Sequence, residues 1–446
     1  MRLRHSPLSF AALVLAAAGC AASAADNEHG PAYGDGGKGD ATAEAGAPDG
    51  GGSPADGAAR ETSITDAPAD SLQEASSPEA SVDTGTDAPA EAANPEDAGA
   101  SEGGTCSSSL AIVAGGSNSV AQSAYAHGVW STASVASGGV AAAPVLVPFG
   151  TGYLGAVVGA GAAGDMPLES TSFTGSWIPP AAIGAALAQG VPALVVVGST
   201  AHVVYWGSNG KFYHGTYSGS WDAASDPVQA SGGPQSFGSS APAAAAVGTT
   251  LVVLQSGQDG VLYDQTWTGS WQAATAHAGT SLVGTLSPAV VALEGGSADL
   301  LVVFVHAGDA GGYFLQYTVR TAGVWSAPSF VYDQGGNVAF AGTTPSLAAL
   351  PGGKAVLAWM GSSPAYPYVS TYDPASGWTA PIAASNDTLA SPPSVAPGVC
   401  GASAVLAYAK TDGTVAVTST SGGPWTTSQL VPGTNGMAWA AVASNP

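Results

Sequence analysis

Seven tryptophans recur at nearly regular intervals in the part of the chain beyond residue 106. They are separated by 47, 44, 50, 54, 53 and 47 residues, and a glycine precedes each by one or two positions. We call them the closing tryptophans: Trp130, Trp177, Trp221, Trp271, Trp325, Trp378 and Trp425. The clearest copies of the repeat are Asn209–Trp221 (NGKFYHGTYSGSW) and Asp259–Trp271 (DGVLYDQTWTGSW). Strand-and-turn repeats of this length are typical of a β-propeller, so we predict an all-β, seven-bladed β-propeller.

One unit, residues 241–276, shows the expected four strands most clearly. They are APAAAAVG, LVVLQSG, VLYDQTWTG and WQAATA, in order from the channel outward. The dipeptide Asp259-Gly260, which Asn209-Gly210 and Asp412-Gly413 match, predicts a type I′ turn between the second and third strands. The second strands are wholly apolar and are expected to be buried on both faces: Leu251–Leu254, Leu300–Val305, Ala355–Trp359 and Ala404–Tyr408.

The first unit lacks an inner strand of its own. Leu110–Ala114 has the pattern of its second strand, and the residues before it are not strand-like. Met437–Ser444 (MAWAAVAS), which follows the last closing tryptophan, resembles an inner strand. We therefore expect the C-terminus to complete the first blade and close the ring, because closure removes exposed sheet edges.

The first 19 residues have the layout of a signal peptide. Arg2 and Arg4 precede an apolar run that is too short to span a membrane. The run ends in Ala-Gly-Cys, which resembles a bacterial lipobox and implies lipidation of Cys20. Ordinary cleavage after Ala-Ser-Ala at residues 22–24 is the alternative. Ala21 is not a retention-type aspartate, so the resemblance implies an outer-membrane lipoprotein, facing the periplasm or the cell surface.

Residues 20–105 are predicted to form a disordered linker between the lipid anchor and the propeller at 106–446. The linker consists mainly of Ala, Gly, Asp, Glu, Pro, Ser and Thr, and Tyr33 is its single aromatic residue. It carries 18 acidic residues against Lys38 and Arg60. Such a composition buries too little apolar surface to offset the entropy of ordering. From Cys106 onward there are 13 acidic residues and four Lys or Arg, which excludes a nucleic-acid partner.

Two further cysteines, Cys106 and Cys400, lie in the predicted propeller. They occupy equivalent positions in the first and seventh units, which adjoin in a closed ring. Export to an oxidising compartment favours a disulfide between them, and two independent thiols are the alternative.

The two best repeats share the phrase G-x-[DN]-G-x-[LF]-Y-x-x-x-[WY]-x-G-S-W, at 207–221 and 257–271. This phrase is similar to the repeats of fucose-binding lectin propellers, and most of all to the seven-bladed Photorhabdus-type lectins. The resemblance implies a lectin-like protein with sugar pockets between adjacent blades. It does not assign those pockets to individual residues of this chain.

Several kinds of catalytic or metal site are excluded or disfavoured. Sialidases resemble this architecture but need several arginines for the substrate carboxylate, and the predicted propeller has only Arg320. The histidines are scattered along the chain, without metal-ligand spacing, so no metal and no cofactor is predicted. Most acidic residues adjoin Gly, Ser or Pro and are typical of turns. We therefore predict that the protein is not an enzyme.

Aromatic side chains in the two best repeats are the strongest candidates for binding. By alternation, Tyr213 and Tyr217 share one strand face, as do Tyr263 and Trp267, while His214 and Asp264 point to the opposite face. We predict a groove between these two units, with the four rings as platforms, His214 and Asp264 as polar anchors, and Trp206 at the rim. Packing of these rings between blades is the alternative.

These observations predict an exported, membrane-tethered, monomeric propeller that binds carbohydrate at inter-blade grooves. A non-catalytic scaffold that binds an envelope protein is the second hypothesis. A glycoside hydrolase is the third, since it would need a pair of suitably placed carboxylates.

Overall fold

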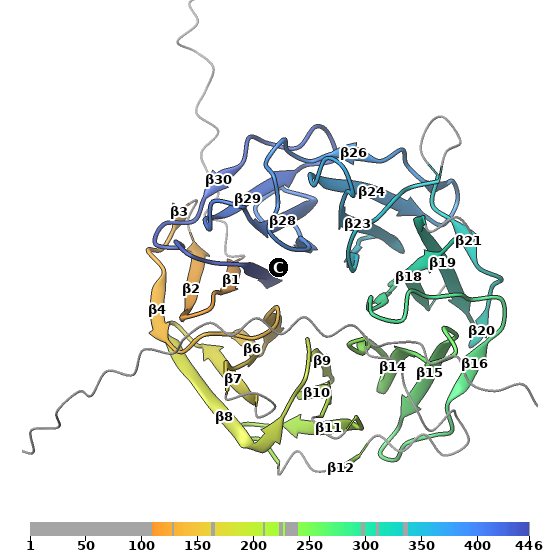
Figure 1. Ribbon diagram of the computed structural model, residues 1–446, viewed down its shortest axis with the longest axis horizontal. Coiled ribbons are helices and arrows are strands. Elements are labelled where there is room, and N and C mark those ends of the chain that lie inside the picture. The colour runs from red at the N-terminus through yellow and green to blue at the C-terminus, as the bar shows by residue number, and fades with distance from the viewer. Residues whose placement is uncertain are drawn as a thin grey trace, which may run out of the picture. The chain divides into compact units, whose positions relative to one another are not determined.

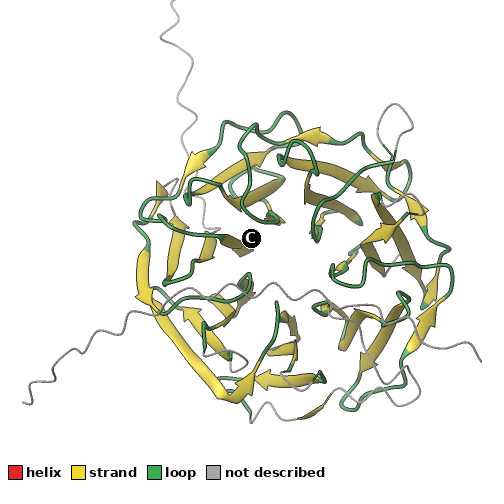
Figure 2. Cartoon of the chain, in the orientation of Figure 1, coloured by secondary structure: helices red, strands yellow, loops and turns green. Residues whose placement is uncertain are grey.

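The computed structural model describes residues 109–126, 129–161, 166–207, 210–222, 226–227, 240–295, 299–308, 312–332 and 338–445. The predicted signal peptide (1–19), linker (20–105) and domain boundary at 106 lie outside these residues. Within them, the chain forms seven antiparallel sheets arranged as blades around a central channel (Figure 1). Strands and loops account for every described element, with no helix among them (Figure 2). Accordingly, the described residues include no helix able to cross a membrane. The seven-bladed propeller is confirmed.

Blades 1 to 3 contain the following strands. Blade 1 is built from β1 (Ser109–Gly115), β2 (Ser119–Ala126), β3 (Val129–Trp130), β4 (Ser134–Ser137) and β31 (Trp439–Asn445). Blade 2 is built from β5 (Val145–Phe149), β6 (Gly152–Val158), β7 (Pro167–Phe173) and β8 (Trp177–Leu187). Blade 3 is built from β9 (Ala193–Val197), β10 (Thr200–Trp206), β11 (Phe212–Tyr217) and β12 (Asp226–Pro227).

Blades 4 to 7 follow the same order from the channel outward. Blade 4 is built from β13 (Ala243–Val247), β14 (Thr250–Ser256), β15 (Leu262–Trp267) and β16 (Thr275–His277). Blade 5 is built from β17 (Ala289–Ala292), β18 (Leu300–Ala307), β19 (Tyr313–Thr321), β20 (Val324–Trp325) and β21 (Ser329–Phe330). Blade 6 is built from β22 (Ser346–Leu350), β23 (Lys354–Met360), β24 (Pro367–Asp373), β25 (Gly377–Trp378) and β26 (Ile382–Ala383). Blade 7 is built from β27 (Ser394–Pro397), β28 (Ala404–Ala409), β29 (Val415–Thr420) and β30 (Gln429–Leu430).

Ring closure takes place in blade 1, as the sequence predicted. The C-terminal strand β31 pairs antiparallel with β1, with Ile112 opposite Val442. It is the inner strand of that blade and lies beside the central channel (Figure 1). Both ends of the propeller therefore contribute strands to the first blade, and their backbone pairing closes the ring.

The core lies between neighbouring blades. The second strands are mainly apolar because both of their faces are covered, and Leu251, Val252, Val253 and Leu254 are all fully buried. Alternate residues of one strand join different clusters. Val252 and Leu254 pack toward blade 5, whereas Leu251 and Val253 pack toward blade 3. The prediction of strands buried on both faces is confirmed.

The predicted type I′ turns are wrong where the structure describes them. Gly260 and Gly413 have positive φ angles of 73° and 81°, but Asp259 and Asp412 do not share that conformation. A type I′ turn needs positive φ at both central residues. Instead, each aspartate accepts a hydrogen bond from the backbone two residues ahead, at 3.0 Å for Val261 and 2.9 Å for Thr414. Asn209 lies outside the described residues.

Candidate functional site

The seven predicted binding residues do not share one groove. Tyr213 and Tyr217, on β11, face blade 2 rather than blade 4. The Tyr217 ring lies 5.4 Å from Phe149 at the end of β5, and Tyr213 stacks on Tyr205 at 5.5 Å. Both tyrosines are half-buried at this interface. They are therefore separated from Trp267 by the full thickness of blade 3.

His214 and Trp267 do meet, between blades 3 and 4. Nε2 of His214 lies 2.9 Å from Nδ1 of His202, and the His214 ring is 5.3 Å from Trp267 and 5.2 Å from Trp271. Both histidines are buried, at 2% and 4% exposure. Trp206 packs against the same cluster. Buried and half-buried rings therefore pack against one another in the part of this interface that the structure describes.

Burial governs the charge of the histidine pair. It lowers the pKa of His214 to about 4, helped by the neighbouring His202 and opposed by Asp222. Burial also lowers the pKa of His202, and Asp222 again acts in the opposite direction. The pair is therefore neutral near pH 7, and one ring donates the shared proton to the other.

Asp264 lies on the far side of blade 4, toward blade 5. Its Oδ1 is 2.7 Å from Nε2 of His277, whose ring lies 4.6 Å from Trp325. Tyr263 points to the other face, where its hydroxyl donates to Asp259 Oδ2 at 2.8 Å. Alternation sends neighbouring residues of a strand to opposite faces, and each face of a blade meets a different neighbour. The single groove is therefore wrong as a grouping, and ligand binding by the individual residues stays a prediction.

One position of the third strand lies beside the closing tryptophan of the same blade. We call it the companion position, since in six blades its residue pairs in register with the closing tryptophan. Its occupants in blades 1 to 7 are Tyr125, Phe173, Tyr217, Trp267, Arg320, Tyr372 and Thr420. In blades 1, 2, 3 and 6 its ring lies 5.2 Å from the closing tryptophan. In blade 5 the Arg320 guanidinium lies 5.7 Å from the Trp325 ring. Blade 7 departs from this rule, because threonine offers neither a ring nor a cation.

A second position, three residues before the companion, faces the next blade. We call it the facing position. Its occupants in blades 1 to 7 are Gln122, Ser170, His214, Asp264, Tyr317, Val369 and Val417. In the first five blades its residue, or in blade 4 the His277 that it holds, reaches across to the next blade. Trp221 Nε1, for example, donates to Ser170 Oγ at 2.8 Å. The two valines are apolar, and cavities lie beside both of them.

The larger of these cavities is a groove of about 540 Å³ between blades 6 and 7. Val369 and Thr420 leave it open, and Trp425 forms one wall. Leu350 and Val356 provide an aliphatic floor. This site was not predicted. The sequence did contain a sign of it. At the companion position, six repeats have an aromatic residue or an arginine, and only the seventh has a threonine.

Polar groups line the rim of the groove. Lys354 Nζ lies 2.8 Å from Asp373 Oδ2, and the lysine side chain is 48% exposed. Thr420 and Thr379 use their hydroxyl groups within the protein, to bond Gly423 and Thr371. Among the described residues, the hydroxyls of Thr371 and Ser403 have no protein partner. A ligand in the groove thus meets one indole wall, an aliphatic floor and a few donors and acceptors.

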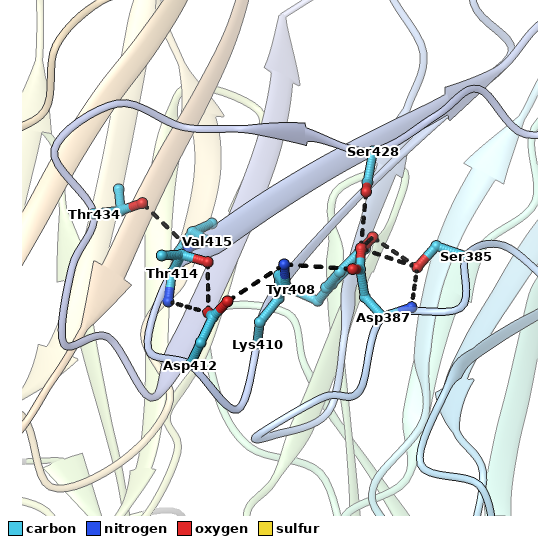
Figure 3. A network of polar contacts seen from close by, with 9 residues as sticks. All are labelled: Ser385, Asp387, Tyr408, Lys410, Asp412, Thr414, Val415, Ser428 and Thr434. Carbon is cyan, nitrogen blue, oxygen red and sulfur yellow. Dashed lines mark hydrogen bonds and ion pairs between the residues drawn. The ribbon is translucent and has the colours of Figure 1, made fainter.

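A polar network holds the segment that connects blades 6 and 7 (Figure 3). Asp387 accepts hydrogen bonds from Tyr408 at 2.7 Å and Ser428 at 2.8 Å, and it lies 3.4 Å from Lys410 Nζ. Burial alone would raise the pKa of Asp387. The hydrogen bonds, including one from Ser385, and the charge of Lys410 outweigh it, so this pKa is lowered. The network fixes the connection without using the groove.

The remaining predicted sites are only partly described. Cys400 is disulfide-bonded and lies beside the cavity of about 180 Å³ between blades 7 and 1. Cys106 and Cys20 lie outside the described residues, so the Cys106–Cys400 pairing and the lipidation stay predictions. The described residues contain no group of three or more His, Cys, Asp or Glu that could hold a metal ion.

Comparison with known proteins identifies the fold and no family. No family model matches this sequence, and the search of curated proteins finds no match. A lectin from Burkholderia pseudomallei superposes with a TM-score of 0.53 at 15% identity, over 72% of this chain and 95% of that one. A fucose-specific lectin from Aleuria aurantia gives a TM-score of 0.45 at 14% identity, over 66% of this chain and 96% of that one. At these identities the likeness shows the propeller fold alone.

Proposed function

We propose that this propeller binds carbohydrate in the groove between blades 6 and 7. One observation carries the proposal: Trp425 is the closing tryptophan whose companion position, Thr420, supplies no ring or cation to cover it. Its indole therefore forms a wall of an open cavity of about 540 Å³. An aromatic wall with a few placed polar groups is the usual make-up of a small-ligand site. The apolar face of a pyranose stacks on the indole, while Thr371, Ser403 and Lys354 bond its hydroxyls.

We propose that the groove binds its ligand without hydrolysing it. The described residues that line it include no Asp or Glu. Glycoside hydrolysis commonly needs a pair of carboxylates on either side of the scissile bond. The same fold in a lectin from Burkholderia pseudomallei supports a sugar-binding propeller as an architecture, although the sequences are only 15% identical.

A glycan array followed by titration calorimetry tests the proposal. The parent protein should retain a defined set of neutral glycans, and Trp425→Ala should weaken their binding at least tenfold. Leu430→Ala is the matched control, since Leu430 is 58% exposed in the same blade and lies outside the groove lining. It should bind like the parent. An array without retained glycans, together with a specific envelope protein recovered by pull-down, would favour the scaffold hypothesis instead.

We also propose that the propeller is displayed on the bacterial cell envelope through a lipid on Cys20 and the acidic linker. The support is the lipobox-like sequence and the linker composition. Metabolic labelling with a radioactive fatty acid should mark the parent and disappear in Cys20→Ser. Labelling that persists in this variant would contradict the anchor.

A further inference from the structure

A cavity of about 470 Å³ lies where the seven inner strands begin. Its lining comes from the first residues of β5, β9, β13, β17, β22, β27 and β31, and from the residues just before these strands. The inner strands surround the central channel (Figure 1), so we call this cavity the channel mouth. It shares none of its described lining residues with the groove between blades 6 and 7.

A proline begins the inner chain of six blades and forms part of the wall. All six are buried and line the channel mouth: Pro144, Pro192, Pro242, Pro288, Pro345 and Pro393. Proline has no N–H and a fixed φ, so these positions add ring carbons to the wall without a hydrogen-bond donor. The repeated proline therefore makes this end of the channel rigid and apolar.

The residue before each of these prolines is half-buried and also lines the channel mouth. It has a small side chain in all six blades: Ala143, Val191, Ala241, Ser287, Thr344 and Pro392. Blade 1 has Trp439, also half-buried, at the equivalent position. The equivalence follows from two matching hydrogen bonds, in which the backbone N–H three residues after Pro392 or Trp439 donates to a serine of the preceding blade. One indole therefore stands among six small side chains.

Three hydroxyl groups give the apolar wall a small number of donors. Thr344, Ser346 and Ser394 each accept a backbone N–H from a neighbouring blade, at 3.1 to 3.2 Å. None of these hydroxyls donates to another described residue. A hydroxyl that accepts a hydrogen bond keeps its own proton for donation. A ligand in the channel mouth can therefore receive a hydrogen bond from the wall.

Charge and shape restrict the ligand further. The described lining contains no charged side chain, so a charged ligand would lose hydration without an ion pair in return. In blades 3 to 6 the lining covers four consecutive residues, such as Val191–Leu194, or about 10 Å of extended chain. A cavity of about 470 Å³ with this depth is wide rather than tubular. It suits a compact ring system better than a long chain.

We propose that the channel mouth binds one uncharged, mainly apolar ring molecule that carries a hydrogen-bond acceptor, of the class of an aryl ketone. The Trp439 indole packs on the ring system, the prolines and small side chains enclose it, and a wall hydroxyl donates to its acceptor. Apolar walls with a few placed polar groups are the usual make-up of a small-molecule site. This site does not depend on the proposed saccharide groove.

Titration of the full chain with a fluorescent aryl ketone tests this inference. The probe is 6-propionyl-2-dimethylaminonaphthalene, which is uncharged and emits at shorter wavelength when it leaves water. The parent should bind one probe per chain. Ala143→Trp and Ala241→Trp each add a ring to the channel mouth, and Trp439→Ala removes its indole, so each should weaken binding at least tenfold. Val324→Ala, which trims a 71% exposed side chain outside the lining, should bind like the parent.

Photolabelling of the parent locates the site even if a variant fails to fold. Benzophenone, a second uncharged aryl ketone, should cross-link to peptides that contain the lining residues, and the fluorescent ketone should compete with it. Cross-links confined to peptides outside the lining would overturn the proposal. So would probe uptake that does not saturate, or parent-like binding by folded Ala143→Trp and Ala241→Trp. Equally tight binding of the anion 1-anilinonaphthalene-8-sulfonate at the same site would overturn the selection for an uncharged ligand.

Discussion

The interface between blades 3 and 4 and the interface between blades 6 and 7 are packed differently. Between blades 3 and 4, which carry the best-kept repeats, the four key positions are His202, His214, Trp267 and Trp271. Between blades 6 and 7, the equivalent positions are Val356, Val369, Thr420 and Trp425. The first set fills its interface with rings in contact at 5.0 to 5.3 Å, and the second leaves a groove of about 540 Å³. The blades pack closely where both repeats carry the ring residues of the motif. The groove lies where valine and threonine replace those rings.

Removing a ring from the filled interface should produce the largest effect. Trp267→Ala deletes a side chain that packs on both histidines, and we expect the free energy of unfolding to fall by about 3 kcal/mol. Chemical denaturation measures this change. Glycan binding should be unchanged. A variant that keeps its stability but loses binding would return Trp267 to the role that the sequence predicted.

The histidine pair should make the filled interface sensitive to acid. The folded chain lowers the pKa of His214 to about 4, whereas an unfolded histidine titrates near 6.5. Between these values only the unfolded state binds the proton, so stability should decrease as the pH falls from about 6.5 to 4. The shift corresponds to about 3 kcal/mol. Melting curves across this range provide the measurement.

Substitution of His214 identifies the source of that slope. His214→Gln introduces the residue that blade 1 has at its facing position, and it cannot titrate. The loss of stability between pH 6.5 and 4 should become smaller in this variant. An unchanged slope would show that other groups, such as His202, whose pKa burial also lowers, cause the acid sensitivity.

Filling the groove should convert one interface into the other. Thr420→Trp places in blade 7 the companion residue of blade 4, and its ring should cover Trp425. We expect glycan binding to weaken at least tenfold, about 1.4 kcal/mol, with an unchanged or slightly higher melting temperature. Calorimetry and thermal melting test both parts. Thr420→Ser, which adds no ring, is the control. Unimpaired binding by Thr420→Trp would place the site elsewhere.

The polar network beside the groove should give the smallest effect. Asp387→Asn keeps the size of the side chain but removes the charge beside Lys410, and we expect a loss of about 1 kcal/mol at pH 7. Because the pKa of Asp387 is lowered in the folded chain, this contribution is present above the unfolded pKa and disappears as the pH falls through the folded one. Denaturation at pH 7 and at a series of lower pH values should therefore show a difference from the parent that becomes smaller as the pH falls. A large loss of glycan binding would indicate that the network shapes the groove.

The sequence by itself determined the architecture. Trp-ending repeats near 50 residues gave the number of blades, and alternation and apolar runs gave the second strands. Met437–Ser444 was identified as the closing strand because it is strand-like and no inner strand precedes Leu110. These features depend on residues close together within one repeat, so they can be recognised without knowing the neighbours. The turn type failed for a local reason as well, since aspartate before glycine also fits a turn in which only the glycine has positive φ.

Only the tertiary structure decided where space remains. Alternation correctly sent His214 and Tyr213 to opposite faces, but it did not show that each face meets a different blade. A cavity depends on the combined volumes of side chains from two blades, such as Val369 and Thr420, which lie 51 residues apart. Each repeat taken alone looks complete, and the missing ring of blade 7 becomes a groove only because a small facing residue of blade 6 stands opposite it. The packing of one blade on the next therefore sets the position of the site.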